Sequence, residues 1–146
     1  MVATETNVLE KAMIVLENAS ACALYLPEYS AIVCVVKREF IIRSDFRALF
    51  ETVGAAARIY LPNKIIFDMR KMEVFDQKIM TWYHTEWKPR LFKEIGLKKY
   101  RKLLPQNKLF RKYVAMNREQ LAKQHAFDFS VFDIRHCETM EQALEF

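Results

Sequence analysis

The chain has 146 residues, a formal net charge of +5 and a hydrophobic content of 52%, which together describe one domain with a substantial core and exclude a disordered protein. Two glycines are too few for the glycine-rich loops of the common nucleotide-binding motifs, and three cysteines without paired spacing argue against a disulfide framework or a zinc knuckle. The longest apolar runs are too short to span a bilayer, and the N-terminus lacks the order of a signal peptide. We therefore expect a single cytoplasmic domain over residues 1–146.

The first part of the chain predicts a loosely patterned lead, a β-hairpin and a helix. Residues 1–19 show weak periodicity, and a short helix within them is one interpretation. Apolar runs at 21–26 and 31–36 flank the sequence Pro-Glu-Tyr-Ser, which is typical of an antiparallel hairpin. An apolar stripe over 44–60, closed by a proline, predicts a helix that lies on the sheet.

Residues 64–105 predict a strand, a helix and a second strand in one run. The apolar segment KIIFD is expected to lie inside the sheet, Asp76 to cap the helix and Gly96 to end it, and KKYRKLLP to form the second strand. Such a crossover assigns the chain to the α/β class. Farther on, Asn107 is expected to cap another helix, 126–134 to form a last strand, and the C-terminus to form a short helix.

Three segments resemble one known family. KIIFDMRKM, FDQKIMTWYHTEWKPRLFKEIGLKK and FDIRHCETMEQALEF are similar to the corresponding parts of the SpoIIAA-like group of the STAS superfamily, in its small stand-alone bacterial form. The resemblance covers about residues 20–146. It implies a mixed sheet of four or five strands with helices packed mainly on one side. It also implies a non-enzymatic regulatory or protein-interaction domain.

The chain departs from that family at its regulatory loop. Anti-sigma factor antagonists carry an Asp-Ser-Ser-Gly type element whose serine is phosphorylated, whereas Asp76, Gln77 and Lys78 stand at the matching positions here. Phosphorylation would add about two negative charges at a helix N-terminus, and this loop has no hydroxyl to accept the phosphate. We expect no phosphorylation switch at this loop. Binding of a partner through the loop is left open.

A strongly basic sector extends from Lys88 to Lys112, with ten basic residues and one acid. Such an asymmetry favours an anionic partner, and a merely solvated face is the alternative. The turn after the KKYRKLLP strand is expected to bring several cations onto one edge of the domain. The candidate binding residues are Lys98, Arg101, Lys102, Lys108, Arg111 and Lys112.

The expected partners follow from this sector. The charge of the sector fits another protein, an anionic lipid or a small phosphorylated ligand. We leave open both a peripheral contact with anionic lipid and a homodimer. Aromatic residues form no ordered base-stacking platform within it, so we expect no specific nucleic-acid partner.

Catalysis and metal binding have weaker support. Asp133, His136 and Cys137 are the residue types that a nucleophilic triad needs. His136 and Cys137, however, are neighbours after a strand, where successive side chains point apart. Asp68 and Asp76 are better interpreted as a solvated strand-end acid and a helix cap than as magnesium ligands. We therefore expect no enzymatic activity, no cofactor and no metal.

The aromatic residues of the central helix favour a structural interpretation. Trp82, Tyr83 and Trp87 recur at helical spacing, which indicates a buried stripe rather than a ligand wall. His84 has no cysteine or aspartate at ligand spacing, and we expect it to be a surface or capped residue.

Overall fold

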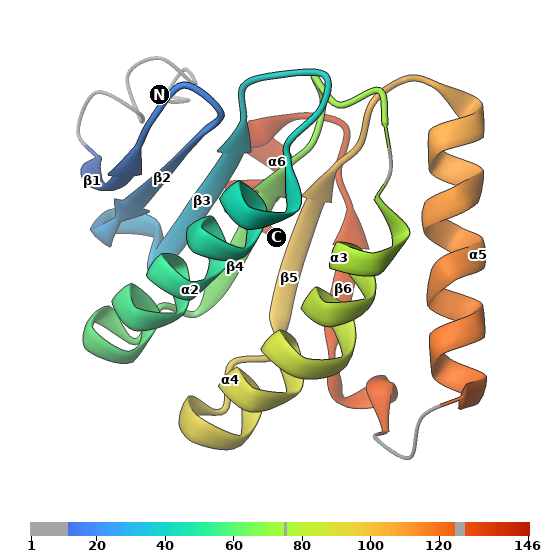
Figure 1. The fold of residues 1–146 in the computed structure, drawn as a ribbon. Coiled ribbons are helices and arrows are strands. Elements are labelled where there is room, and N and C mark those ends of the chain that lie inside the picture. The colour runs from blue at the N-terminus through green and yellow to red at the C-terminus, as the bar shows by residue number, and fades with distance from the viewer. Residues whose placement is uncertain (1–11, 75, 125–127) are drawn as a thin grey trace.

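A six-stranded mixed sheet organises the computed structural model, which describes residues 12–74, 76–124 and 128–146 (Figure 1). The first three strands are antiparallel neighbours, and the third to sixth are parallel. The α/β class and the mixed sheet are thereby confirmed. Across the sheet the strands keep their chain order: β1 (Met13–Glu17), β2 (Ala21–Leu26), β3 (Ala31–Val36), β4 (Lys64–Asp68), β5 (Lys99–Leu103) and β6 (Asp133–His136).

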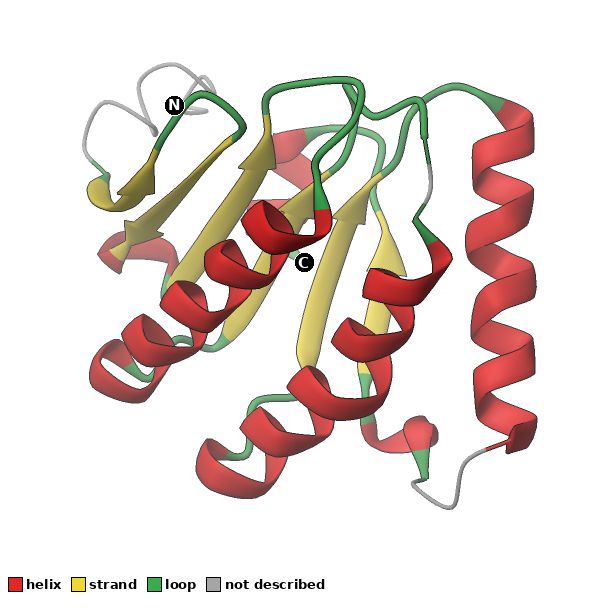
Figure 2. Ribbon diagram, in the orientation of Figure 1, coloured by secondary structure: helices red, strands yellow, loops and turns green. Residues whose placement is uncertain are grey.

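Most of the helices lie on one face of this sheet (Figure 2). That face carries α2 (Arg43–Tyr60), α3 (Gln77–Trp82), the π-helical turn η2 (Tyr83–Trp87) and α4 (Lys88–Ile95). The short helix α6 (Met140–Glu145) covers the opposite face, and α5 (Lys108–Gln124) stands beside α3 at the β6 end of the sheet. Two 3-10 turns, η1 (Pro27–Tyr29) and η3 (Phe129–Val131), complete the described elements. Within the described ranges, no helix is both long enough and apolar enough to cross a membrane.

The sheet has one strand more than the expected maximum of five. Residues Met13–Glu17 form the edge strand β1, which pairs antiparallel with β2. Asn18 closes the connecting turn, because its Oδ1 accepts a hydrogen bond of 2.9 Å from the Ala21 amide. The prediction of a loosely patterned lead over 1–19 is therefore wrong for residues 13–17. Residues 1–11 lie outside the described part.

The helix boundaries predicted at Asp76, Gly96 and Asn107 are confirmed. The Asp76 carboxylate accepts hydrogen bonds from the first amides of α3, and Asn107 Oδ1 does the same for α5. Gly96 follows α4 with φ at 74°, a left-handed conformation that glycine adopts without a Cβ penalty. Local sequence chemistry therefore places the helices that flank β5.

An aromatic cluster fills the core beneath α2 and η2. The Phe50 ring centroid lies 4.6 Å from that of Tyr83, 5.0 Å from that of Trp87 and 5.1 Å from that of Phe67. Trp87 Nε1 donates a hydrogen bond of 2.7 Å to the Phe50 carbonyl oxygen, which satisfies its polar atom inside the core. Trp82, Tyr83 and Trp87 are all buried, which agrees with the prediction that they form a buried stripe.

A second, smaller core lies between the sheet and α6. Val33, Ile66 and Leu103 contribute from the strands, and Met140 and Leu144 contribute from the helix. Strand β4 is buried along its whole length, since it lies between two parallel neighbours and under helices on both faces. Its predicted place inside the sheet is confirmed.

The last strand begins later than its alternating pattern predicts. Of the expected strand over 126–134, residues 129–131 form the turn η3, and the strand occupies Asp133–His136. Asp128 explains the difference, because its Oδ1 accepts hydrogen bonds from the Ser130 amide and hydroxyl at 3.0 and 2.6 Å. This Asx turn breaks the extended conformation; residues 126 and 127 are outside the described part.

Candidate functional site

The structure divides the basic sector instead of gathering it on one edge. Lys98 is exposed at the start of β5, whereas Lys108 and Lys112 are exposed on α5 beyond its far end. A strand of five residues is about 16 Å long, so these cations lie at opposite ends of the domain. The expectation of one shared edge is therefore wrong for Lys98, and the binding roles of these three lysines stay a prediction.

Alternation along β5 separates the two cations within the strand. Arg101 pairs in register with Ile66 on the α6 face, and Lys102 pairs with Phe67 on the aromatic face. Both side chains are buried. Arg111, at the start of α5, donates to the Pro105 carbonyl oxygen at 2.7 Å and lies 3.7 Å from a Glu138 carboxylate oxygen.

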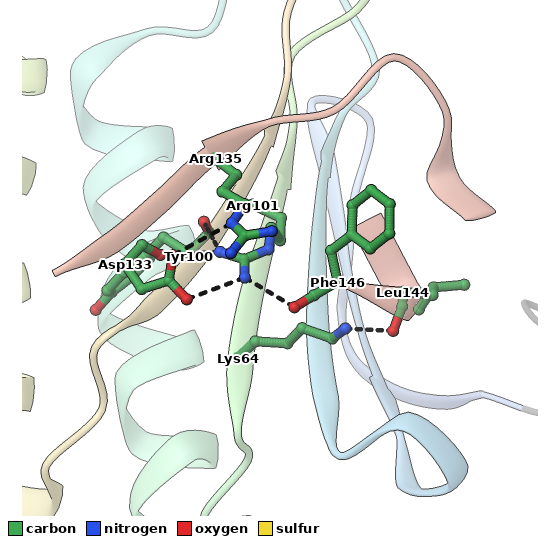
Figure 3. A network of polar contacts seen from close by, with 7 residues as sticks. All are labelled: Lys64, Tyr100, Arg101, Asp133, Arg135, Leu144 and Phe146. Atoms are coloured by element: carbon green, nitrogen blue, oxygen red, sulfur yellow. Dashed lines mark hydrogen bonds and ion pairs between the residues drawn. The ribbon is translucent and has the colours of Figure 1, made fainter. Parts of the chain in front are cut away.

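Arg101 holds the C-terminal segment against the sheet (Figure 3). Its guanidinium donates to the main-chain oxygens of Tyr100, Asp133 and Phe146 at 2.8 to 2.9 Å, and to Asp133 Oδ2 at 3.1 Å. This hydrogen bond is the main cause that lowers the pKa of the Asp133 carboxyl. Arg101 is therefore a structural residue, because both of its terminal nitrogens donate within the chain, although its buried Nε has no partner among the described residues.

Lys64 makes a parallel contact on the same face. Its ammonium donates to the Leu144 carbonyl oxygen near the C-terminus of α6 (Figure 3). Burial, with the nearby charges of Lys99 and Arg101, lowers the pKa of Lys64 to about 8. The two cations together tie α6 to the sheet.

On the other face, a cleft of about 390 Å³ lies between α5 and the β6 end of the sheet. We call it the α5 cleft. Its polar wall consists of His84 from η2, Lys88 from α4, and Arg118 and Glu119 from α5. Its apolar wall consists of Ala115, Leu121, Ala122, Phe129, Phe132 and Ile134.

The π-helical turn places two of the basic residues in this wall. The Lys88 amide donates to the Tyr83 carbonyl oxygen five residues earlier, which adds one residue to that turn. His84 and Lys88, four residues apart, both line the α5 cleft. The expectation that His84 is a surface or capped residue is wrong, because its side chain is buried beside cations.

Lys88 is the most unusual residue of the cleft. It is 1% exposed, and its Nζ has no hydrogen-bond partner within the part of the chain that the structure describes. The nitrogen lies 4.5 Å from the ring centroid of Tyr100, 4.8 Å from that of Tyr83 and 5.9 Å from that of Phe132. Cation–π contacts of this kind contribute about 0.5 to 2 kcal/mol, which offsets only part of a desolvation cost of several kcal/mol.

Burial and mutual repulsion shift the titration of the whole cluster. Burial is the main cause that holds the pKa of Lys88 and of His84 well below their usual ranges, and Lys102 and Arg118 lower both further. Burial also lowers the pKa of Lys102 to about 7. Across the described residues, none of the four basic side chains of His84, Lys88, Lys102 and Arg118 forms an ion pair. The cluster is therefore electrostatically suited to an anion from outside the chain.

The loop that matches the family's phosphorylation site has local roles. Asp76 caps α3, and its Oδ2 accepts a hydrogen bond of 2.7 Å from Arg43 Nε. Burial alone would raise the pKa of its carboxyl, but these hydrogen bonds outweigh burial and lower it. Gln77 and Lys78 are exposed at the start of α3, and Gln77 lines a second cleft of about 290 Å³ together with Asn117 of α5. Binding of a partner at this loop stays a prediction.

The residues considered for catalysis lie in separate environments. Asp133 contacts Arg101, and His136 Nε2 lies 3.7 Å from a Glu138 carboxylate oxygen. Cys137 is buried, and burial is the main cause that raises the pKa of its thiol. The three therefore share no hydrogen-bonded arrangement among the described contacts.

Metal binding has no support at the acidic residues considered. Asp68 pairs with Arg70 at 2.7 Å, and Asp76 is engaged with Arg43 and its helix. No group of three or more His, Cys, Asp or Glu side chains suited to a metal occurs in residues 12–74, 76–124 and 128–146.

Comparisons with known proteins add no relative: no protein-family model, no curated protein and no solved structure matches this chain. The resemblance to the SpoIIAA-like group therefore remains a hypothesis. Sequence reasoning included Lys88 and Lys102 in the basic sector but missed their convergence with His84 and Arg118. The four-residue spacing of His84 and Lys88 within a helix was the available signal.

Proposed function

We propose that this chain is a binding module for a small organic anion with an apolar body, held in the α5 cleft. One observation carries the proposal: His84, Lys88 and Arg118 converge on a cleft with apolar walls, with Lys102 buried nearby, and none has an ion-pair partner among the described residues. The volume of about 390 Å³ falls within the range of sites for small ligands. We include in the proposal a cytoplasmic location and a non-enzymatic role.

The two kinds of wall define the chemistry of the ligand. Arg118 is exposed and permanently charged, so it is placed to hold a carboxylate or phosphate at the outer part of the cleft. Phe132, Leu121 and Ile134 offer apolar surface for the rest of the molecule. A bound anion would also stabilise the protonated forms of the buried bases, because it would supply the opposite charge that they lack.

Displacement of a fluorescent apolar anion tests this proposal. Anilinonaphthalene sulfonate is bound to the protein at pH 7 and displaced with 4-methylbenzoate, 4-methylphenyl phosphate or the uncharged 4-methylbenzyl alcohol. Both anions are expected to displace it far better than the alcohol, and their relative strengths distinguish a carboxylate site from a phosphate site.

Three variants locate the binding. Arg118→Gln should weaken both anions by about tenfold or more, since a charge-assisted hydrogen bond contributes about 1.5 to 3 kcal/mol. Ala122→Glu places a carboxylate in the cleft wall and should abolish binding. Lys123→Gln, an exposed change on the same helix that leaves the lining intact, should bind as wild type does. Equal affinities in all three variants would remove the proposal.

A second candidate is the protein-interaction role that the resemblance implies. Leu109, Tyr113 and Met116 form an exposed apolar stripe on α5, at 55%, 48% and 44% exposure. Such a stripe suits a protein partner, a second copy of this chain included. Sedimentation equilibrium of wild type and Tyr113→Glu tests the second copy: a dimer lost in the variant supports it, and a monomeric wild type excludes it.

A further inference from the structure

We propose that Lys88 is a nucleophilic amine that forms a reversible imine with an aldehyde or ketone group of an organic acid in the α5 cleft. The inference deepens the proposed function and rests on it, because the same cleft must first admit the acid. It adds a covalent step at a named atom and a requirement for a carbonyl group in the ligand.

The position of the nitrogen is the first reason. Lys88 lines the cleft, its side chain is 1% exposed and its Nζ is buried, so the nitrogen lies behind the cleft wall and is shielded from bulk water. A bound ligand must displace part of that wall to reach it. In the described part of the chain it has no hydrogen-bond partner that would engage its protons or its lone pair. Its three close neighbours are the faces of the Tyr83, Tyr100 and Phe132 rings.

The surrounding charges are the second reason. His84 approaches from η2, Lys102 from β5 and Arg118 from α5, and the acid that lines the cleft, Glu119, is exposed. Burial, and after it the charges of Lys102 and Arg118, lower the pKa of the Lys88 ammonium, which increases the share of the free amine at neutral pH. A desolvated lysine near other cations is the usual environment of an imine-forming amine.

The chemistry balances without an outside oxidant or reductant. The Nζ lone pair adds to the carbonyl carbon, and a proton moves from nitrogen to oxygen to give a carbinolamine. Loss of one water molecule then forms the carbon–nitrogen double bond, and addition of water reverses the step. The buried His84 imidazole lines the same cleft, where it is placed to relay these protons.

The cleft also orients the ligand. Arg118 is exposed and Lys88 is buried, so an acid whose anionic group contacts Arg118 directs its other end inward, toward Nζ. Leu121 and Phe132 contribute apolar walls to the same cleft. The preferred ligand class is therefore an oxo acid with its carbonyl and its anionic group at opposite ends of an apolar body.

Reductive trapping tests the inference. The full chain is mixed with 4-formylbenzoate and cyanoborohydride at pH 7, and the modified lysine is identified by peptide mass spectrometry. An ordinary lysine is uncharged in about one molecule in 2,500 at pH 7. Lys88 should therefore be the first lysine modified, ahead of every exposed lysine. Addition of 4-methylbenzoate, which lacks the aldehyde, should protect Lys88 by competition.

Matched variants separate the two proposals. Lys88→Arg removes the nucleophile, so it should lose rapid trapping, while binding of 4-methylbenzoate is measured on the wild type, where Lys88 is intact. Lys88→Met serves as a second variant if arginine disturbs the fold. Arg118→Gln keeps the amine and should slow trapping by weakening the bound acid.

Each outcome decides the matter. Rapid trapping at Lys88, blocked by 4-methylbenzoate, supports the inference. Binding of 4-methylbenzoate without a preferred adduct at Lys88 overturns it and leaves the proposed function intact. An adduct at Lys102, or equal labelling of the exposed lysines, also overturns it. Failure of 4-methylbenzoate and 4-formylbenzoate to bind at all removes both proposals.

Discussion

Replacing Lys102 with methionine should stabilise the protein, and by an amount that depends on pH. Lys102 is buried on the aromatic face of β5 without an ion-pair partner among the described residues, and its pKa is about 7 against a reference value of 10.5. The folded state therefore releases this proton at a lower pH than the unfolded state does. Methionine is unbranched and similar in length, so it fills the same space without a charge.

The sign and size follow from proton linkage. Between pH 7 and pH 10.5 the unfolded chain holds more of this proton than the folded chain, so the free energy of unfolding of the wild type rises with pH. Each pKa unit corresponds to about 1.4 kcal/mol, which makes the cost of the buried amine about 4 kcal/mol at pH 7 and about 2 kcal/mol at pH 9. The advantage of Lys102→Met should shrink by that difference of about 2 kcal/mol.

Urea denaturation at pH 7 and at pH 9 measures the effect. The groups that face Lys102 include His84 from η2, Lys88 from α4, Arg118 from α5 and His136 from β6, and all remain in the variant. The exposed change Lys71→Met is the matched control and should leave the pH slope unchanged. A Lys102→Met variant that is no more stable than wild type at pH 7, with the same pH slope, would refute the interpretation of a buried, unpaired amine.

Three further predictions concern stability and reactivity. Ile65→Ala in the buried strand β4 should lower the free energy of unfolding by about 2 to 5 kcal/mol in urea, and a loss under about 0.5 kcal/mol would contradict its central position. Arg101→Met should loosen the C-terminal segment, because it removes the donors to Asp133 and Phe146; hydrogen exchange of the α6 amides should rise, and unchanged protection would show that apolar packing alone holds α6. Cys137 should react slowly with iodoacetamide at pH 7, because burial raises the pKa of its thiol; rapid alkylation would contradict that burial.

Local chemistry explains what the sequence predicted well. Asp76 and Gly96 are residues whose side chain, or lack of one, determines a helix end within a few positions. The β4 segment is a short apolar run bounded by charges, a pattern that requires burial on both faces. The α/β class follows from these two kinds of signal.

Long-range packing explains what the sequence could not show. Alternation predicts that Arg101 and Lys102 face opposite sides of the sheet. It does not predict that Phe146, just after α6, accepts a hydrogen bond from Arg101 while Lys102 lies near the charge of Arg118. The α5 cleft depends on how α5 stands against β6, which no local pattern specifies. The strand β1 was missed because a pairing partner, rather than its own weak pattern, determines its conformation.

The central claim is that the α5 cleft, and not the exposed lysines of the basic sector, binds an organic anion. Backbone amide chemical shifts recorded during titration with 4-methylphenyl phosphate test it most directly. We expect saturable shifts centred on His84, Lys88, Arg118 and Phe132. Weak, non-saturating shifts centred on the exposed residues of 108–112, with the cleft residues unchanged, would contradict it.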